Sequence, residues 1–150
     1  MNQQQLKIIK QINESKLLSY TEKIINRYIE EKKKEINHTT IPLNVFIEKV
    51  LRRSKCRFNI VILTNIYFER YINTKDMEIE DERKIFIGVL ILAFKYWNDY
   101  HHKNKTWVEI IGLEIKEINR IERIILNKIN LFVTLEFFIE DIEKYQLLQY

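Results

Sequence analysis

Glycine and proline are nearly absent from this chain, which has 2 glycines and 1 proline in 150 residues. β-Sandwiches and barrels use both residues freely in their turns, so this scarcity favours helices. Gly88 and Gly112 stand far apart, which excludes glycine-rich phosphate loops and dinucleotide-binding fingerprints. With 46% hydrophobic and 31% charged residues, the chain is apolar enough to bury the core of one domain.

Two segments, Asn59 to Asn73 and Glu82 to Tyr100, are apolar on nearly all sides of a helix. Helices of this kind lie at the centre of a bundle, so we expect these two to be the most buried of the chain. The longest apolar run, Ile85 to Phe94, is much shorter than the roughly 20 residues that cross a bilayer. No membrane span, and no membrane partner, is therefore expected.

Amphipathic segments flank this central pair. Capping boxes predict helix starts at Ser19, paired with Glu22, and at Thr106, paired with Glu109. Pro42 and Thr134 predict two further starts, and Gly112 predicts a helix end. The apolar positions of the flanking helices are Leu6, Ile9 and Ile12; Ile25, Tyr28 and Ile29; Ile118, Ile121, Ile125 and Ile129; and Phe137, Phe138, Ile142 and Tyr145. The pattern predicts an all-α domain of six or seven helices.

Catalytic and metal-binding patterns are missing from the sequence. Cys56 is the single cysteine, which excludes an internal disulfide or a multi-cysteine zinc site and favours a reducing compartment. His101 and His102 are adjacent, His38 stands alone, and together with Asp99 they match no recognised ligand spacing. We therefore expect no metal, no cofactor and no enzymatic activity.

The positive charge of the chain is modest. Lys and Arg exceed Asp and Glu by 25 to 21, a formal charge of +4. A basic cluster runs from Arg52 to Arg57, and its simplest interpretation is a solvated helix end. The surplus permits an acidic partner without specifying nucleic acid.

Two charged residues interrupt apolar stripes. Lys95 lies within the most apolar helix, and Glu122 lies four residues after Ile118 and three before Ile125. Burying an unpaired charge is prohibitive, so each must be paired or must reach a surface. Lys95 could extend past its neighbours to water, and Glu122 could form an internal salt bridge, even with Lys95 itself. The alternative is an interface at which both meet the polar backbone of a partner.

Four segments together resemble the cyclin box, and most closely that of the P-type cyclins. They are IYFERY at 66–71, LAFKYWND at 92–99, WVEIIGL at 107–113 and INRIE at 118–122. In order, they are similar to the family patterns I-Y-L-D-R, A-S-K-Y-x-D-D, W-A-x-V-G-G-L and L-N-x-L-E. The resemblance covers roughly Ile41 to Tyr145. It implies a single cyclin box of five core helices over residues 41–150, preceded by an N-terminal helical extension over residues 1–40.

The resemblance also implies a function, the binding and activation of a cyclin-dependent protein kinase as a heterodimer. In the family, a lysine and a glutamate hold the kinase N-lobe beside its C-helix, and Lys95 and Glu122 match those positions. The residues that correspond to the lining of the apolar pocket for the C-helix are Tyr96, Leu126 and Val133. Asp99 matches one member of the family's acidic pair, whose other position is Asn98 here. A cyclin of this kind would act inside the cell, in the nucleus, the cytoplasm or both.

Two alternatives remain at this stage. Helical domains of the cyclin type also occur in basal transcription factors, and the Arg52–Arg57 cluster would suit a module that binds nucleic acid or the transcription machinery. The modest charge and the Lys95/Glu122 pattern argue against nucleic acid as the partner. A scaffold that binds a kinase without activating it is the second alternative. The substrate-recruiting patch of mitotic cyclins is not recognisable between Ile41 and Lys55.

Overall fold

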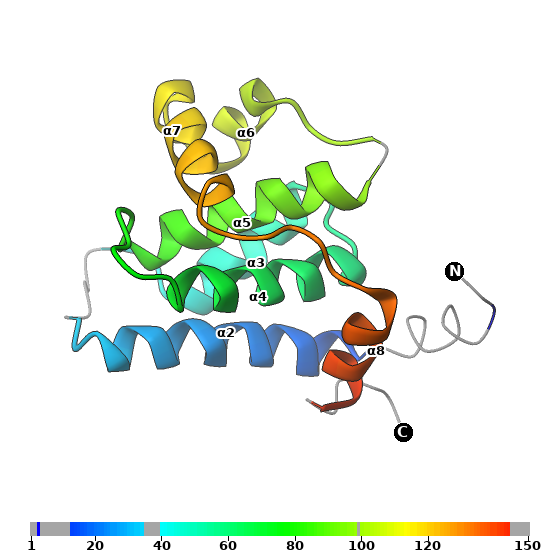
Figure 1. Ribbon diagram of the computed structural model, residues 1–150. Coiled ribbons are helices and arrows are strands. Elements are labelled where there is room, and N and C mark those ends of the chain that lie inside the picture. Colours follow the sequence, from blue (N-terminus) through cyan, green and yellow to red (C-terminus); the bar gives the residue numbers. More distant parts are fainter. Residues whose placement is uncertain (1–2, 4–12, 35–39, 99, 145–150) are drawn as a thin grey trace.

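The computed structural model describes residues 3, 13–34, 40–98 and 100–144, and within these ranges the protein is all-α (Figure 1). This confirms the predicted fold class. Some predicted positions lie outside the described residues, namely Leu6, Ile9, Ile12, His38, Asp99 and Tyr145. The helices are α2 (Glu14–Glu31), α3 (Leu43–Arg53), α4 (Phe58–Ile72), α5 (Glu82–Trp97), α6 (Asn104–Ile111), α7 (Ile115–Leu126) and α8 (Leu135–Lys144).

Helices α4 and α5 form the centre of the core, as their all-round apolarity predicts. Every residue from Ile60 to Phe68 and from Ile85 to Phe94 is buried. The two helices pack most extensively on each other; α2 covers the far side of α4, and α7 covers α5 (Figure 1). Among the described residues, no helix combines the length and the apolarity that crossing a membrane requires.

Both predicted capping boxes are wrong as helix starts. Helix α2 begins five residues before Ser19, because the side chain of Asn13 accepts a hydrogen bond from the amide of Lys16 at 3.0 Å. Helix α6 likewise begins before Thr106, after Lys103. A hydroxyl residue three positions before a glutamate is also compatible with a helix interior, so the pattern did not identify the true ends.

The other predicted helix ends are confirmed. Pro42 directly precedes α3, and the hydroxyl of Thr134 accepts from the amide of Phe137 at 3.1 Å to cap α8. Gly112 ends α6 with a φ of 75°, in the left-handed region where glycine is favoured.

Helix α2 is joined to the core by polar as well as apolar contacts. Its residues Leu17, Ile24 and Ile25 are buried in the same cluster as α4 and α5. The hydroxyl of Thr21 donates to its own helix at the carbonyl of Leu17 and accepts from the amide of Asn65 on α4 at 3.0 Å. The buried polar groups of Thr21 and Asn65 thus have hydrogen-bond partners, and the contact between them fixes the register of α2 on α4.

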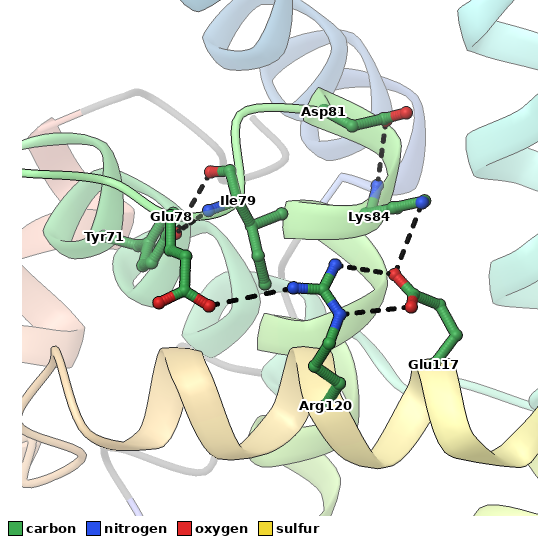
Figure 2. A network of polar contacts seen from close by, with 7 residues as sticks. All are labelled: Tyr71, Glu78, Ile79, Asp81, Lys84, Glu117 and Arg120. Atoms are coloured by element: carbon green, nitrogen blue, oxygen red, sulfur yellow. Dashed lines mark hydrogen bonds and ion pairs between the residues drawn. The ribbon is translucent and has the colours of Figure 1, made fainter.

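A polar network joins the α4–α5 connection to α7 (Figure 2). Tyr71 on α4 donates its hydroxyl to the carbonyl of Ile79 and accepts from the Ile79 amide, both at 3.0 Å. On α7, Arg120 forms two hydrogen bonds with Glu117 and lies 3.8 Å from a carboxylate oxygen of Glu78. Lys84, near the start of α5, donates to Glu117 at 3.3 Å. This network fixes one end of α5 relative to α7.

Candidate functional site

The candidate site lies where α5 and α7 approach each other closely, and Gly88 permits that approach. A Cβ at Gly88 would lie 2.6 Å from Cγ2 of Ile121 and closer still to Cδ1 of Ile125. Lys95 follows Gly88 by seven residues, about two helical turns, and so lies on the same face of α5. Glu122 directly follows Ile121 on α7. The close packing therefore brings these two charged residues together.

Lys95 and Glu122 form an ion pair across this contact. The ammonium of Lys95 lies 2.8 Å from Oε1 and 2.7 Å from Oε2 of Glu122. The side chains are 29% and 18% exposed, so the pair lies at the edge of the core and remains accessible to water. The internal salt bridge considered from the sequence is therefore present. Its partial exposure leaves the interface hypothesis for the two residues open as a prediction.

Asn104, at the start of α6, is a third member of this polar group. Its amide nitrogen donates to Oδ1 of Asn119 at 2.7 Å and to Oε2 of Glu122 at 3.4 Å. A carboxylate offers about four acceptor positions, of which three are used in these contacts. The Lys95 ammonium has three N–H groups, of which two are used. Both ends of the pair therefore retain capacity for one more hydrogen bond.

The predicted apolar neighbours of the pair differ in exposure. Tyr96 is 44% exposed and Leu126 is 46% exposed. Val133 is only 8% exposed and belongs to the core. Tyr96 and Leu126 are thus exposed in the isolated chain, whereas Val133 is packed in the core. Asp99, the remaining predicted site residue, lies outside the described residues.

Two α4 side chains hold the segment between α7 and α8 in place. The hydroxyl of Tyr67 donates to the carbonyl of Leu131 at 2.6 Å, and Arg70 donates to the carbonyls of Asn130 and Phe132 at 2.5 and 2.9 Å. Burial, and to a smaller extent the nearby hydroxyl of Tyr96, raises the pKa of Tyr67. The three hydrogen bonds from Tyr67 and Arg70 fix residues 130–132 on α4.

Two aromatic residues of this region were not predicted as surface residues. Phe132 is 61% exposed, and Phe137 is 46% exposed although it was expected among the apolar positions of α8. Arg70 lies near both, because it bonds the Phe132 carbonyl and its guanidinium carbon is 5.8 Å from the centre of the Phe137 ring. The apolar spacing of α8 predicted that Phe137 would face the core together with Phe138 and Ile142. Only Phe138 and Ile142 are buried.

The described residues contain no group of three or more His, Cys, Asp or Glu side chains that could hold a metal ion. Cys56 is partly buried, and burial raises the pKa of its thiol to about 12. A thiol with such a pKa is almost entirely protonated at neutral pH and is a poor nucleophile.

Comparison with known proteins identifies the family. Residues 7–134 match the family model described as "Cyclin, N-terminal domain". The chain is similar to PHO85 cyclin-5 of Saccharomyces cerevisiae, with 33% identity over 104 residues, covering 64% of this chain and 45% of that protein. It is 34% identical to PHO85 cyclin-2 of the same yeast over 100 residues, covering 63% of this chain and 32% of that protein. It is also 23% identical to Cyclin-U2-1 of Arabidopsis thaliana over 80 residues, covering 51% of this chain and 36% of that protein.

The chain thus spans less than half the length of these curated relatives. The similarity to the PHO85 cyclins confirms the resemblance to P-type cyclins. The family match extends over most of the chain and includes α2 to α7, among them the central pair α4 and α5. Together with the all-helical fold, this shows that the chain belongs to the cyclin family, through the N-terminal cyclin domain.

Proposed function

We propose that this chain binds a cyclin-dependent protein kinase and activates it. The observation that carries the proposal is the Lys95–Glu122 ion pair, which lies at an accessible edge of the α5–α7 contact and has exposed apolar residues next to it in the sequence. Tyr96 directly follows Lys95, and Leu126 follows Glu122 by one helical turn. This combination of polar anchors and apolar surface suits a protein partner.

The polar part of the surface can bind backbone groups of a partner. One N–H of Lys95 and one acceptor position of Glu122 remain after their contacts with each other and with Asn104. A kinase loop could donate an amide to Glu122 and offer a carbonyl to Lys95. Hydrogen bonds that involve ionised groups are stronger than neutral ones, so these contacts would hold the loop in one orientation.

The apolar part of the surface supplies the area for binding. Tyr96 and Leu126 are both nearly half exposed, and Phe132 is exposed further along the chain. Covering such side chains stabilises a complex by roughly 25 cal/mol for each Å² of apolar surface removed from water. We infer that the kinase C-helix packs against Tyr96 and Leu126, with Val133 supporting them from the core.

Activation then needs no catalytic group in this chain. A protein kinase is active when a glutamate of its C-helix pairs with the lysine that binds ATP. A rigid partner that binds this arrangement more tightly shifts the kinase population toward it. The chain would therefore be a regulatory subunit, acting in the nucleus, the cytoplasm or both.

The test compares Leu126→Gln with Ile115→Gln, two substitutions at opposite ends of α7. Leu126 and Ile115 are 46% and 43% exposed, so both variants should fold equally well. The tagged chain is used to capture kinases from its source cells, and each captured complex is assayed for phosphorylation of a histone substrate. We expect Leu126→Gln, and not Ile115→Gln, to reduce both kinase capture and activity. Capture of a kinase without an increase in its activity would leave only a scaffold role, and failure to capture one would contradict the proposal.

A further inference from the structure

A pocket of about 360 Å³ lies where the end of α3, the start of α4 and the segment after α5 meet. The basic cluster found in the sequence contributes to it, and so does the histidine pair from the polar segment before α6. Residues that are distant in the sequence thus meet at one hollow, which the sequence did not predict. Those used in the argument are Lys55, Arg57, Phe94, Tyr100, His101 and His102.

The pocket is held open by contacts of His102. Its Nε2 lies 2.8 Å from the carbonyl oxygen of Ser54, so this nitrogen carries a proton and donates. Its ring packs against those of Phe94 and Trp107, with centres 5.5 Å apart in both cases. Ser54 and Trp107 are buried, so the segment after α5 is joined to the end of α3 through the core. The pocket is therefore formed before any ligand binds.

No carboxylate of the described residues forms an ion pair with the cations at this pocket. Within residues 13–34, 40–98 and 100–144, neither Lys55 nor Arg57 forms an ion pair, whereas Lys34, Lys84 and Lys95 each do. The described residues that line the pocket include no aspartate or glutamate. Like charges gathered at one hollow raise its potential, so an anion that enters the pocket is attracted.

We propose that this pocket binds the phosphate group of a phosphorylated serine or threonine on a partner protein. A guanidinium and an ammonium can both donate to phosphate oxygens, and Arg57 can do so with two parallel N–H groups. Phe94 and Tyr100 give the pocket apolar walls, and Tyr100 is 84% exposed. Such walls can contact the residues next to a phosphorylated side chain, which an inorganic phosphate ion lacks. The site shares no residue with the Lys95–Glu122 surface, so it goes beyond the proposed function.

A nucleic acid is a poorer match to the same observations. Its phosphates are spaced along a strand and are normally bound by a stripe or groove of basic residues. Here the basic groups converge on one pocket, and the whole chain has a formal charge of only +4. One phosphate with a short stretch of chain on either side fits this arrangement better.

The test uses the full chain labelled with ¹⁵N and titrated with a short peptide that has one phosphoserine between leucines. The unphosphorylated peptide, inorganic phosphate and a single-stranded oligonucleotide are titrated separately. We expect saturable shifts of the amides of Lys55, Arg57, His101 and His102 with the phosphopeptide, weaker ones with inorganic phosphate, and none with the unphosphorylated peptide. The double variant Lys55→Ala/Arg57→Ala should weaken phosphopeptide binding roughly tenfold or more, because two charge-assisted contacts are lost.

The matched control is Lys23→Ala/Arg27→Ala, which removes two cations from another pocket of about 490 Å³ whose lining also includes Glu22 and Glu30. This control should leave phosphopeptide binding unchanged. An equal loss in the control, or no phosphate-dependent binding, would overturn the proposal. If inorganic phosphate bound as tightly as the phosphopeptide, the ligand would be a free ion and the proposal would be wrong. If the oligonucleotide bound more tightly than the phosphopeptide, the ligand would be a nucleic acid and the proposal would be wrong as well.

Discussion

The ammonium of Lys95 lies within 2.8 Å of both carboxylate oxygens of Glu122, so the two charged residues of the α5–α7 contact neutralise each other. Neither side chain is fully enclosed, since 29% of Lys95 and 18% of Glu122 is exposed. A pair at such an edge contributes little to folding, because water already solvates both ions in part. It is nevertheless held in one geometry by the packing of α5 on α7.

Glu122→Ala should therefore affect binding much more than folding. In the free chain we expect a loss of about 1 kcal/mol or less, which lowers the melting temperature by about 2–4 °C. In a kinase complex the same change would leave buried donors unpaired, at a cost of roughly 1–3 kcal/mol, or about a tenfold to hundredfold loss of affinity. Thermal melting and a direct affinity measurement test the two parts. The exposed glutamate Glu109, changed to alanine, is the control.

A double-mutant cycle with Lys95→Ala and Glu122→Ala should give two different results. In the free chain, the coupling free energy should be below about 1 kcal/mol and should decrease with added salt. In kinase binding, the double variant should lose much less affinity than the sum of the single variants, because both residues anchor the same loop. Additive losses of affinity would mean that the two residues contact separate parts of the kinase or none.

The sequence predicted the centre of the fold better than its edges. All-round apolarity identified α4 and α5 because a helix that is apolar on all sides must be buried by its neighbours. The start of α2 was misplaced because Asn13 caps the helix before the hydroxyl pattern at Ser19 begins. The buried pair of Thr21 and Asn65 was not predicted either, since it depends on how α2 lies on α4.

In the candidate site, too, some features could be predicted from the sequence and others could not. Lys95 and Glu122 stood out because each interrupts an apolar stripe, and their contact was one of the alternatives considered from the sequence. The exposure of Phe132 and the burial of Val133 could not be predicted, because both follow from the path of an irregular segment. That path is set by hydrogen bonds from α4 to backbone carbonyls, which have no sequence pattern.

Gly88→Ala should destabilise the protein even though alanine favours helices more than glycine does. A Cβ at this position would lie 2.6 Å from Ile121 and closer to Ile125, so α5 and α7 must move apart. Overpacking of this kind typically costs about 1–3 kcal/mol. The denaturant midpoint should fall, and the Lys95–Glu122 coupling should weaken. An unchanged or higher midpoint would show that the two isoleucines can rearrange without cost.

The stability of the protein should fall in acid partly through Glu117 (Figure 2). Hydrogen bonds from Arg120, and then from Lys84, lower the pKa of the Glu117 carboxyl to about 2. Because this folded-state pKa lies below the ordinary glutamate value of about 4.3, the contribution is complete above that value and is lost as the pH falls toward 2. Urea midpoints across this range should show a smaller pH dependence for Glu117→Gln than for the wild type. Glu109→Gln should behave like the wild type, and identical profiles for all three proteins would contradict this role of Glu117.

Tyr67→Phe should weaken kinase binding without altering the Lys95–Glu122 pair. The Tyr67 hydroxyl donates to the carbonyl of Leu131 at 2.6 Å, so its removal costs about 1 kcal/mol and frees one attachment of the segment that carries Phe132 and Val133. Amide hydrogens of that segment should exchange faster. Tyr71→Phe is a matched control, because it removes a similar hydroxyl one helical turn further along α4, which bonds Ile79 and not the segment between α7 and α8. We expect similar losses of stability from both changes, but a loss of kinase affinity only from Tyr67→Phe; equal losses of affinity would mean that overall stability, and not the position of this segment, controls binding.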